Sequence, residues 1–541
     1  MRRSAILLVL AGSIIAIGAT HRSRAFFSSA LSPASAANTT ALAAGNAPNC
    51  RYGAALIPRF MTSTPWLNTL GVGWYMNFEP YEFDIRPAGA DLARVIRVEQ
   101  ARLGDGFLPE YQIFPPLTDD GLGDLVRRHP GELWLIGNEP DVNNVVQDAT
   151  FPEVYARAYH EVFHYIKAID PTAQVANGAL SMITPGRLQY LSIVWDTYQQ
   201  LYGRPMPVDM WNMHLYILSE AKPFGDGQGD GKVALGTDPA LARMAPLHGD
   251  PTLCPDPNVI CRAEHDDLSI FAEQVVAMRT WMKARGQQYK PLILSEVGSL
   301  YSAAPAAGGC GVADEYGQCF TPERATRYLL AVNDYLESAA DPLIGNPLDG
   351  GRLVQQWSWY SLVTEPHWSG GTGNLLTRDY DAYYPGDPSA LTPVGRALES
   401  QLSGRAVYPD LQALASPPQW VLVEGPATTD LQLKAWFVNN GNITIKRPFT
   451  VTFYRDAALT QPIASTTVGS YVRGCARRLR EATVVWPNVP SGRHQYWVKV
   501  DSGNAVPERD ETHANNVATA VITVFSRADV RQVYLPAQLY R

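Results

Sequence analysis

The sequence predicts an α/β protein in which a (β/α)8 barrel is followed by a smaller all-β sandwich domain. After the polar stretch that ends near Asn49, short apolar segments alternate with amphipathic helical segments for about 350 residues, the pattern of a parallel sheet with helical crossovers. Eight of these segments have the character of strands, and eight is the strand number of a closed barrel. Beyond residue 420 the helical period ends, and alternating strands separated by turns such as Asn439-Asn440-Gly441 follow, as in a sandwich.

The barrel strands are predicted in the order of the chain. They are Tyr52–Ile57, Leu70–Met76, Ala93–Val98, Leu133–Gly137, Gln174–Gly178, Val208–His214, Leu292–Ser295 and Leu353–Trp357. The second and third have the weakest patterns, because Asp91–Gln100 is equally compatible with a helix. Helix start signals follow later strands at Thr150–Glu153, Thr321–Arg324 and Thr392–Pro393.

The sandwich strands are predicted from alternation of apolar and polar residues. They are Leu431–Val438, Phe449–Tyr454, Glu481–Trp486, Gln495–Val500 and Val517–Val524. The expected organisation is a signal and export segment at 1–36, the barrel at 50–405, a linker rich in Pro, Ala and Ser at 406–420, the sandwich at 421–526 and a tail at 527–541. A long segment from Ile217 to about Glu264 is predicted to be an insertion over one mouth of the barrel.

The amino-terminal segment predicts export. Two arginines precede the apolar run from Ala5 to Ala19, which is short for a spanning helix and typical of a secretory signal. Cleavage is possible after Ala25 or Ala36, but the basic residues at 21, 22 and 24 leave an uncleaved anchor as an alternative. The protein is therefore expected to be secreted or held at the cell surface.

The composition excludes several classes of protein. The chain has 541 residues, of which 46% are hydrophobic and 18% charged, and this balance excludes intrinsic disorder. The formal net charge of −8 repels a phosphate backbone, which excludes general nucleic-acid binding and favours neutral partners.

Six cysteines are expected to form disulfides in an oxidising compartment. The short spacings favour one bridge between Cys254 and Cys261 and another between Cys310 and Cys319. The two remaining residues, near the start of the barrel and in the sandwich, are Cys50 and Cys475, and whether they pair is left open. No CxxC or His-rich spacing supports zinc, and neither a metal nor a cofactor is predicted.

Two acidic residues follow predicted strands at positions where barrel enzymes have their active sites. Glu139 follows the fourth strand, and Glu296 ends the apolar run of the seventh, 157 residues later. Two carboxyl groups that meet at one mouth can cleave a glycosidic bond, one as a proton donor and one as an ionised nucleophile or base. The structural alternative is a loop cap at Glu139 and an ion pair at Glu296. A serine or cysteine nucleophile has less support, because the sequence has no GxSxG motif.

The residues around the two acids resemble a known group. Asn138-Glu139-Pro140, followed by Ser295-Glu296-Val297-Gly298, resembles the clan A glycoside hydrolases, retaining enzymes built on a TIM barrel. Gly73–Asn77 together with Gly137–Asp141 is also similar to the endo-β-1,3-glucanase family called Asl1-like. The resemblance implies that Glu139 is the acid/base, that Glu296 is the nucleophile and that Asn138 binds the sugar 2-hydroxyl.

Further substrate-binding residues are predicted at the same mouth. Alternation places His214 and Tyr216 on one side of the sixth strand, and the resemblance implies that Tyr216 is a partner of Glu296 and His214 a substrate contact. Sugar rings pack their C–H faces on aromatic rings, so Trp357 is the first candidate for a platform, with Trp74 and Asn77 as further contacts. A buried structural role is the alternative for His214 and for each of these aromatic residues.

The carboxyl-terminal domain resembles the CARDB-type adhesion modules of bacterial surface proteins. The resemblance is found in Trp436–Gly441, Phe453–Asp456, Val500–Asp501 and Val506–Asn516. It implies an immunoglobulin-like sandwich that binds or spaces, with possible contact to a cell surface or glycan, and no chemistry.

Together these patterns predict an exported retaining glycoside hydrolase that acts on a poly- or oligosaccharide. The alternative from another class is a non-catalytic carbohydrate-binding or adhesion protein with a degenerate barrel. Exo action on short oligosaccharides is a further possibility, if the insertion after Tyr216 blocks one end of the substrate groove.

Overall fold

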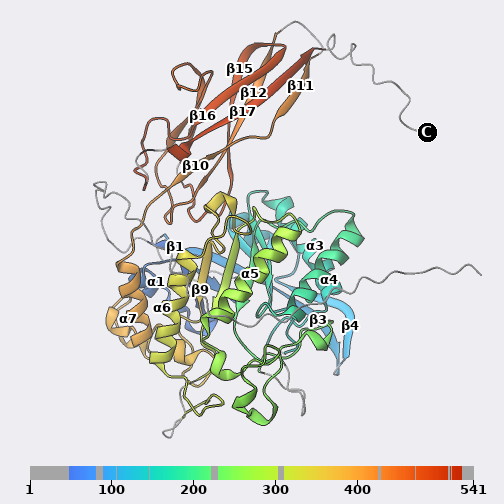
Figure 1. Ribbon diagram of the computed structural model, residues 1–541, viewed down its shortest axis with the longest axis vertical. Helices are drawn as coiled ribbons and strands as arrows, with labels where there is room; N and C mark the ends of the chain where they lie inside the picture. Colours follow the sequence, from blue (N-terminus) through green and yellow to red (C-terminus); the bar gives the residue numbers. More distant parts are fainter. Residues whose placement is uncertain are drawn as a thin grey trace, which may run out of the picture. The chain divides into compact units, whose positions relative to one another are not determined.

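A computed structural model of the protein describes residues 48–526, apart from residues 81–88, 105, 145, 221–229, 303–309, 424–427, 470, 510–511 and 513. Figure 1 shows the chain from the barrel strands in blue and green to the β domain in orange and red. The predicted export segment and carboxyl-terminal tail lie outside the described residues, as does part of the insertion that follows Tyr216.

Eight parallel strands form the barrel. They are β1 (Asn49–Leu56), β2 (Val72–Asn77), β3 (Asp91–Leu103), β5 (Leu133–Asn138), β6 (Gln174–Ala179), β7 (Trp211–Leu215), β8 (Leu292–Val297) and β9 (Gln356–Trp359). They are hydrogen-bonded in the order β6-β5-β3-β2-β1-β9-β8-β7, and a parallel bridge between Ala176 and Met210 joins the two ends. Each strand overlaps one predicted segment, and Asp91–Gln100 lies in a strand.

Helices follow most of the strands and cover the outside of the barrel. They are α1 (Trp66–Leu70), α2 (Leu122–Arg128), α3 (Pro152–Ile169), α4 (Pro185–Tyr202), α5 (Leu268–Ala284), α6 (Pro322–Ser338) and α7 (Pro393–Ser403). The hydroxyls of Thr321 and Thr392 accept hydrogen bonds from the first turns of α6 and α7, as expected of helix caps. At α3 the cap residue is Phe151, and its side chain accepts no such bond.

Short 3-10 helices occur in the loops. In the barrel they are η1 (Pro58–Ser63), η2 (Pro239–Leu241), η3 (Leu247–Gly249), η4 (Pro251–Leu253), η5 (Arg262–Glu264), η6 (Pro347–Asp349), η7 (Gly371–Gly373), η8 (Tyr380–Ala382) and η9 (Pro388–Ala390). Four of them, η2 to η5, lie in the insertion between β7 and α5.

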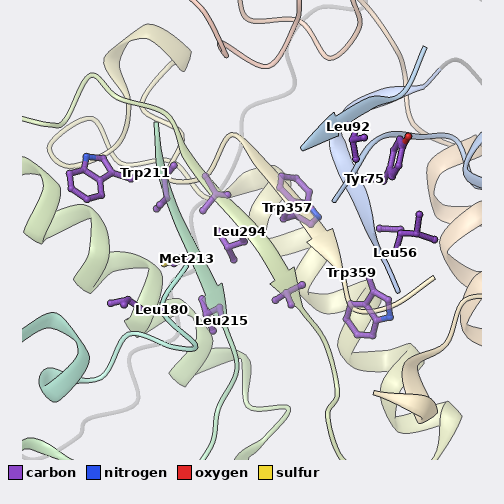
Figure 2. Close-up of a cluster of buried hydrophobic side chains, with 14 of the residues drawn as sticks. Leu56, Tyr75, Leu92, Leu180, Trp211, Met213, Leu215, Leu294, Trp357 and Trp359 are labelled. Atoms are coloured by element: carbon purple, nitrogen blue, oxygen red, sulfur yellow. The ribbon is translucent and has the colours of Figure 1, made fainter. Parts of the chain in front are cut away.

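The barrel strands bury both faces. Their outward side chains pack under the helices, and Figure 2 shows part of this core with Leu56, Trp211, Met213, Leu294 and Trp357. A separate cluster contains residues of the opposite strand parity and fills the barrel interior. Its buried members are Ala55, Trp74, Met76, Ala93, Val95, Leu133, Leu135, Ala176, Met210 and Ile293. The barrel is therefore a packed core whose polar groups lie at its ends.

One hairpin was not predicted from the sequence. Strand β3 continues past its barrel neighbours and pairs in antiparallel fashion with β4 (Gly106–Phe114). Most of β4 is exposed, and its alternation of burial is weak, so its sequence carries little strand signal.

Two packed sheets form the β domain. One contains β10 (Leu411–Leu414), β12 (Thr428–Asn439) and β15 (Arg480–Pro490), and the other contains β11 (Gln419–Val423), β17 (Val517–Ser526), β16 (Gly492–Lys499), β13 (Phe449–Tyr454) and β14 (Pro462–Val468); η10 (Ala514–Asn516) precedes β17. Buried residues of both sheets share one core. The five predicted strands are present, whereas β10 lies within the segment predicted to be a linker.

Three disulfides join the six cysteines. The bridges between Cys254 and Cys261 and between Cys310 and Cys319 are the two predicted local ones. The third joins Cys50 and Cys475, which the sequence left open, over a separation of 425 residues. Three disulfides are consistent with an oxidising compartment. Among the described residues, no helix is long and apolar enough to cross a membrane.

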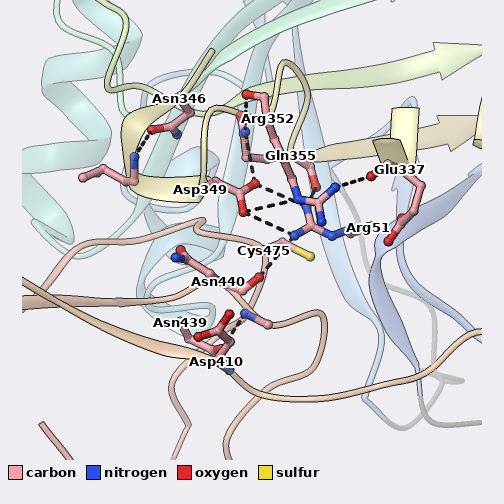
Figure 3. A network of polar contacts seen from close by, with 12 residues as sticks. Arg51, Glu337, Asn346, Asp349, Arg352, Gln355, Asp410, Asn439, Asn440 and Cys475 are labelled. Carbon is pink, nitrogen blue, oxygen red and sulfur yellow. Dashed lines mark hydrogen bonds and ion pairs between the residues drawn. The ribbon is translucent and has the colours of Figure 1, made fainter. Parts of the chain in front are cut away.

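A buried arginine lies beside the long-range disulfide. Figure 3 shows Arg51, at the start of β1, donating to both carboxylate oxygens of Asp349 at 3.3 Å and to the Asn440 carbonyl of the β domain at 3.1 Å. The side chain of Arg51 is only 1% exposed, so an unpaired charge here would be strongly unfavourable. The disulfide and the hydrogen bonds of Arg51 thus connect the same two parts of the chain, the start of β1 and the β domain.

We predict that removal of the long-range disulfide destabilises the protein more than removal of a local one. A cross-link restricts the unfolded chain more when it closes a longer loop, so Cys50→Ala/Cys475→Ala should lower the free energy of unfolding by about 2–5 kcal/mol. Urea denaturation measures the change. Cys254→Ala/Cys261→Ala, which opens a separation of only 7 residues, is the control. An equal or larger loss in the control would contradict the prediction.

Candidate active site

The two predicted carboxyl groups meet at the carboxyl end of the barrel. Glu139 directly follows β5, the fourth barrel strand, and Glu296 is the penultimate residue of β8, the seventh. A carboxylate oxygen of each lies within 4.8 Å of the other and of a ring nitrogen of His214. The exposed fraction is 8% for Glu139 and 5% for Glu296, so both carboxyls are largely removed from water.

A left-handed backbone conformation directs Glu139 to this position. Strand β5 ends at Asn138, after which Glu139 has a φ of 45° while its backbone N–H donates to the Ala179 carbonyl at 3.0 Å. A non-glycine residue in this region costs about 1–2 kcal/mol. Such strain persists where surrounding contacts fix the backbone, and it is concentrated at functional sites. Because of this turn, the adjacent side chains of Asn138 and Glu139 do not have to point to opposite faces, as they would in a regular strand.

An irregularity of pairing directs Glu296. In β8, Leu292 and Leu294 belong to the outer core and Ile293 to the barrel interior, so strict alternation would turn residue 296 outward. The register shifts on both sides of this point, toward β7 and toward β9, and Glu296 then pairs with His214. A bulge of this kind turns a side chain to the other face of a strand. Both acids therefore depend on a local break in strand geometry.

His214 lies between the two acids. Its Nδ1 is 2.9 Å from Glu139 Oε1, and its Nε2 is 3.2 Å from Glu296 Oε1. The sequence predicted His214 as a substrate contact; in the structure both ring nitrogens face the carboxylates, so it orients them. The Tyr216 hydroxyl donates to Glu296 Oε2 at 2.7 Å, which is the partnership expected of Tyr216.

Burial and charge set the protonation of this group. Burial raises the pKa of Glu296 from 4.5 to about 7; His214 and the Tyr216 hydroxyl oppose the rise, and the Glu139 carboxylate adds to it. Burial disfavours the charged form of His214, but the adjacent carboxylates of Glu296 and Glu139 outweigh this effect and raise its pKa. The protonation states of Glu296 and His214 therefore depend on each other.

A buried aspartate holds the loop that carries the first acid. Asp148 Oδ2 accepts hydrogen bonds from the backbone N–H groups of Asn138 at 2.8 Å and Val98 at 3.0 Å, while Arg97 Nε donates to Oδ1 at 2.5 Å. Burial raises the pKa of Asp148 to about 6 against the lowering effect of Arg97 and the two N–H groups. The Asn138 side chain donates to Gln147 Oε1 at 2.7 Å. Asp148 follows no strand and was not predicted from the sequence.

A second buried network attaches the insertion to the mouth. Arg187, at the start of α4, forms ion pairs with Asp141 and with Glu220, the latter at 3.2 Å, and all three side chains are 0% exposed. Arg187 also donates to the carbonyls of Gly231 and Lys232 at 2.9 and 2.8 Å. The loops after β5 and β7 are thus bound to one cation. No sequence motif marks this network, because its members come from three separate loops.

The other residues predicted to bind substrate lie in different parts of the barrel. Trp357 is in the outer core, where its indole N–H donates to Asn333 of α6 at 2.8 Å, so it packs between strand and helix and not as a sugar platform. Trp74 is 2% exposed within the barrel interior. Asn77, at the end of β2, is 1% exposed, and its side-chain oxygen accepts from the Glu79 N–H at 3.3 Å.

Tyr360 takes the position near the acids that was expected of Trp357. Its ring lies 6.5 Å from that of Tyr216 and 6.3 Å from that of Phe78, edge to face in both cases. Burial raises the pKa of Tyr360, and the negative charges of Glu296 and Glu139 add to this effect. Strand alternation favours Tyr360 over Trp357, since Trp357 and Trp359 share the outer face and the chain turns after the strand ends.

A neutral histidine connects the loops that follow β7 and β8. His265 Nδ1 lies 2.8 Å from the Ile217 carbonyl, and Nε2 accepts from the Leu300 N–H at 2.9 Å. Because a backbone N–H donates to Nε2, that nitrogen is unprotonated and the ring is neutral. Burial lowers the pKa of His265 to about 4. Ile217 follows Tyr216 directly, so this histidine helps to fix the residue that binds Glu296.

The comparisons with known proteins give similar structures only. No protein-family model matches the sequence, and no curated protein matches it significantly. An endo-β-1,3-glucanase of family GH128, subgroup I, from Amycolatopsis mediterranei, in complex with laminarihexaose, is 13% identical with a TM-score of 0.37 and covers 65% of this chain and 98% of its own. A GH128 subgroup VII oligosaccharide-binding protein from Trichoderma gamsii is 12% identical with a TM-score of 0.34, at 66% and 96% coverage.

A small part of the chain is similar to another solved structure. The CARDB domain of a Pyrococcus furiosus protein, solved with two metal ions, is 24% identical with a TM-score of 0.17 and covers 22% of this chain and 94% of its own. Likenesses at this level do not determine what the site does, so the functional argument that follows depends on its geometry.

We predict that His265 makes the stability of the protein depend on pH. The pKa of about 4 in the folded state lies below the ordinary 6.5, so the unfolded chain binds the proton more tightly. The contribution of His265 to the free energy of unfolding should therefore decrease by about 3 kcal/mol as the pH falls from 6.5 to 4, opposite in sign to the contributions of Glu296 and Asp148, whose pKa values are raised. The difference between the wild-type protein and His265→Asn, in urea denaturation at several pH values, measures the slope that His265 adds.

The control for this prediction is a second histidine of the same insertion. His265→Asn should flatten the slope, whereas His248→Asn, at an exposed position, should retain it. An unchanged slope in His265→Asn would show that the acid-sensitive group is elsewhere.

Proposed function

We propose that the protein is an exported retaining glycoside hydrolase that cleaves O-glycosidic bonds of a poly- or oligosaccharide. The observation that supports this proposal is the carboxyl pair, with oxygens of Glu139 and Glu296 within 4.8 Å at the ends of the fourth and seventh barrel strands. Retaining enzymes hold their carboxyls about 5–5.5 Å apart, and inverting enzymes leave about 6.5–9.5 Å for a water molecule. A separation of no more than 4.8 Å between these oxygens is nearer to the retaining range than to the inverting one.

The proposed reaction has two displacements. In the first, protonated Glu139 donates to the glycosidic oxygen while the Glu296 carboxylate attacks the anomeric carbon, so that the C–O bond to the leaving sugar breaks as the glycosyl-enzyme forms. In the second, the Glu139 carboxylate takes a proton from water, which attacks the same carbon and releases Glu296. His214 and Tyr216 keep the nucleophile oriented in both steps, and the Tyr216 hydroxyl stabilises its charge.

The substrate class follows from the surroundings of the pair. The aromatic rings of Tyr360 and Phe78 are partly buried beside the barrel interior, where they can pack against the apolar face of a sugar ring. Asn138, next to the acid, carries an amide suited to a sugar hydroxyl. A β-1,3-glucan is the narrower candidate, from the resemblance of Gly73–Asn77 and Gly137–Asp141. We propose a binding or spacing role for the β domain, as an immunoglobulin-like module.

We predict that both acids are essential but in distinguishable ways. Glu139→Ala should reduce kcat/KM for natural glycans by about 10²–10⁴-fold and spare kcat/KM for aryl glycosides whose leaving group needs no proton. Glu296→Ala should abolish turnover of both substrates. With added azide, Glu296→Ala should give a glycosyl azide of inverted configuration and Glu139→Ala one of retained configuration, as observed by NMR.

Two controls make this test decisive. Glu153→Ala, at an exposed carboxyl in the first turn of α3, should retain full activity. EDTA should also leave activity intact, because the proposed chemistry uses no metal; loss on chelation would mean that Glu139, His214 and Glu296 hold a cation. A panel of soluble glycans that bind without release of reducing ends would contradict hydrolysis and favour a binding protein.

We predict that the acid limb of the pH–rate profile lies well above that of an ordinary glutamate. Glu296 must be ionised to attack, and its pKa of about 7 means that kcat/KM for an aryl glycoside should fall tenfold per pH unit below that value. Tyr216→Phe removes a hydrogen bond that lowers this pKa, so its limb should move to higher pH. An acid limb near pH 4.5, or an acid limb that does not move in Tyr216→Phe, would contradict the assignment of Glu296 as the nucleophile.

A further inference from the structure

A cluster of arginines lines a cavity at the end of the barrel opposite to the carboxyl pair. The cavity has a volume of about 400 Å³, and its lining includes Arg473, Arg478 and Arg480 from the β domain with Gly131 and Thr172 from the barrel. We call it the arginine groove. Gly131 and Thr172 lie just before β5 and β6 in the chain, so the groove is at the amino ends of these parallel strands. It is therefore separate from the candidate active site.

A second cavity adjoins the arginine groove. It measures about 320 Å³ and shares Arg478 and Thr172 with the first. Its lining adds three cations, which are Lys167, Lys290 and Arg477, and one carboxylate, which is Asp209. That carboxylate is already paired with Lys167 at 2.7 Å. Positive charge thus exceeds negative charge along both cavities, in a protein whose net charge is −8.

The arginines are only partly compensated by acids, of which Asp170 lies near enough for the charge of Arg478 to lower its pKa. Arg473 and Arg477 share Asp91, at 3.2 and 3.0 Å. Within the described part of the chain, neither Arg478 nor Arg480 forms an ion pair. Burial lowers the pKa of Arg480, and the positive charges of Arg478 and Arg473 lower it further. Like charges gathered around an open cavity repel one another, and a bound anion would relieve this repulsion.

The loop that carries these arginines is fixed in place. Cys475 is joined to Cys50 at the start of the barrel, and Arg473 donates to the Gly131 carbonyl at 2.5 Å. The Arg477 carbonyl accepts from the Gln174 side chain at 2.7 Å. Three residues of the loop, Tyr471, Cys475 and Ala476, have positive φ values of 83°, 62° and 50°. A site that is already ordered loses little conformational entropy when it binds a ligand.

We propose that the arginine groove binds the tetrahedral oxyanion groups, phosphate or sulfate, of an anionic polymer. Guanidinium groups present paired N–H donors that match such oxyanions, and they keep their charge when partly buried. Two adjoining cavities with a shared arginine fit successive charged groups along one chain. The groove is at the opposite end of the barrel from the mouth, so the polymer attaches the protein and is not its substrate.

Binding of two polymers to the full-length protein tests the proposal and distinguishes the sources of the oxyanion. Dextran sulfate and long-chain polyphosphate are the probes, with neutral dextran as the reference, and calorimetry at low and high salt measures the affinity. Arg478→Gln/Arg480→Gln should weaken binding of the preferred polymer by about 10- to 100-fold and reduce its salt dependence. Preference for one polymer identifies the oxyanion.

Matched variants distinguish binding at the arginine groove from non-specific attraction to positive charge elsewhere on the β domain. Arg455→Gln/Arg493→Gln removes the same charge from exposed positions of the β domain and should retain binding. Arg478→Lys/Arg480→Lys keeps the charge without the paired donors and should bind with intermediate affinity. Thermal melting establishes that each variant is folded, and hydrolysis of a neutral soluble glycan should be unchanged in all of them.

Three results would overturn the proposal. They are absence of binding by the wild-type protein to both polymers, equal losses in the two glutamine variants, and unchanged binding in Arg478→Gln/Arg480→Gln. None of these outcomes bears on the carboxyl pair, because hydrolysis is measured separately on a neutral substrate.

Discussion

The candidate site depends on the placement of two like charges in a volume from which water is largely excluded. Carboxylates within 4.8 Å repel one another strongly where few water molecules screen them. His214 offsets this repulsion because each of its ring nitrogens faces one of the acids. The contact with Glu296 also couples the protonation of Glu296 and His214, so a proton lost by one changes the proton affinity of the other.

Regular secondary structure alone would not create this arrangement. The barrel brings the ends of β5 and β8 to one mouth, but each acid is turned toward the other by an irregularity, a left-handed residue at Glu139 and shifted pairing at Glu296. The surrounding polar network keeps these irregularities in place. Asp148 fixes the backbone of Asn138, and Arg187 holds the loops that frame it. These buried ion pairs and hydrogen bonds therefore maintain the geometry of the mouth.

Sequence reasoning recovers features that are local in the chain. The eight barrel strands could be predicted because parallel strands are continuous apolar runs, and the two short disulfides because their cysteines are close together. The pair of acids could be found because both follow such runs. The shift at Glu296 could not, since it depends on register across three strands. The role of the buried Glu508 could not be predicted either. Its carboxylate accepts a hydrogen bond from the Leu411 N–H and so orders β10, where a linker was expected.

The bridge between Cys50 and Cys475 also affects how the protein responds to damage. One of the two cysteines lies in β1, the first barrel strand, and the other lies inside the β domain. A protease that cuts between α7 and β10 would break the only peptide connection between the two domains, yet the fragments would remain joined through sulfur. They would separate only after reduction, so under oxidising conditions a nicked molecule would keep both of its parts.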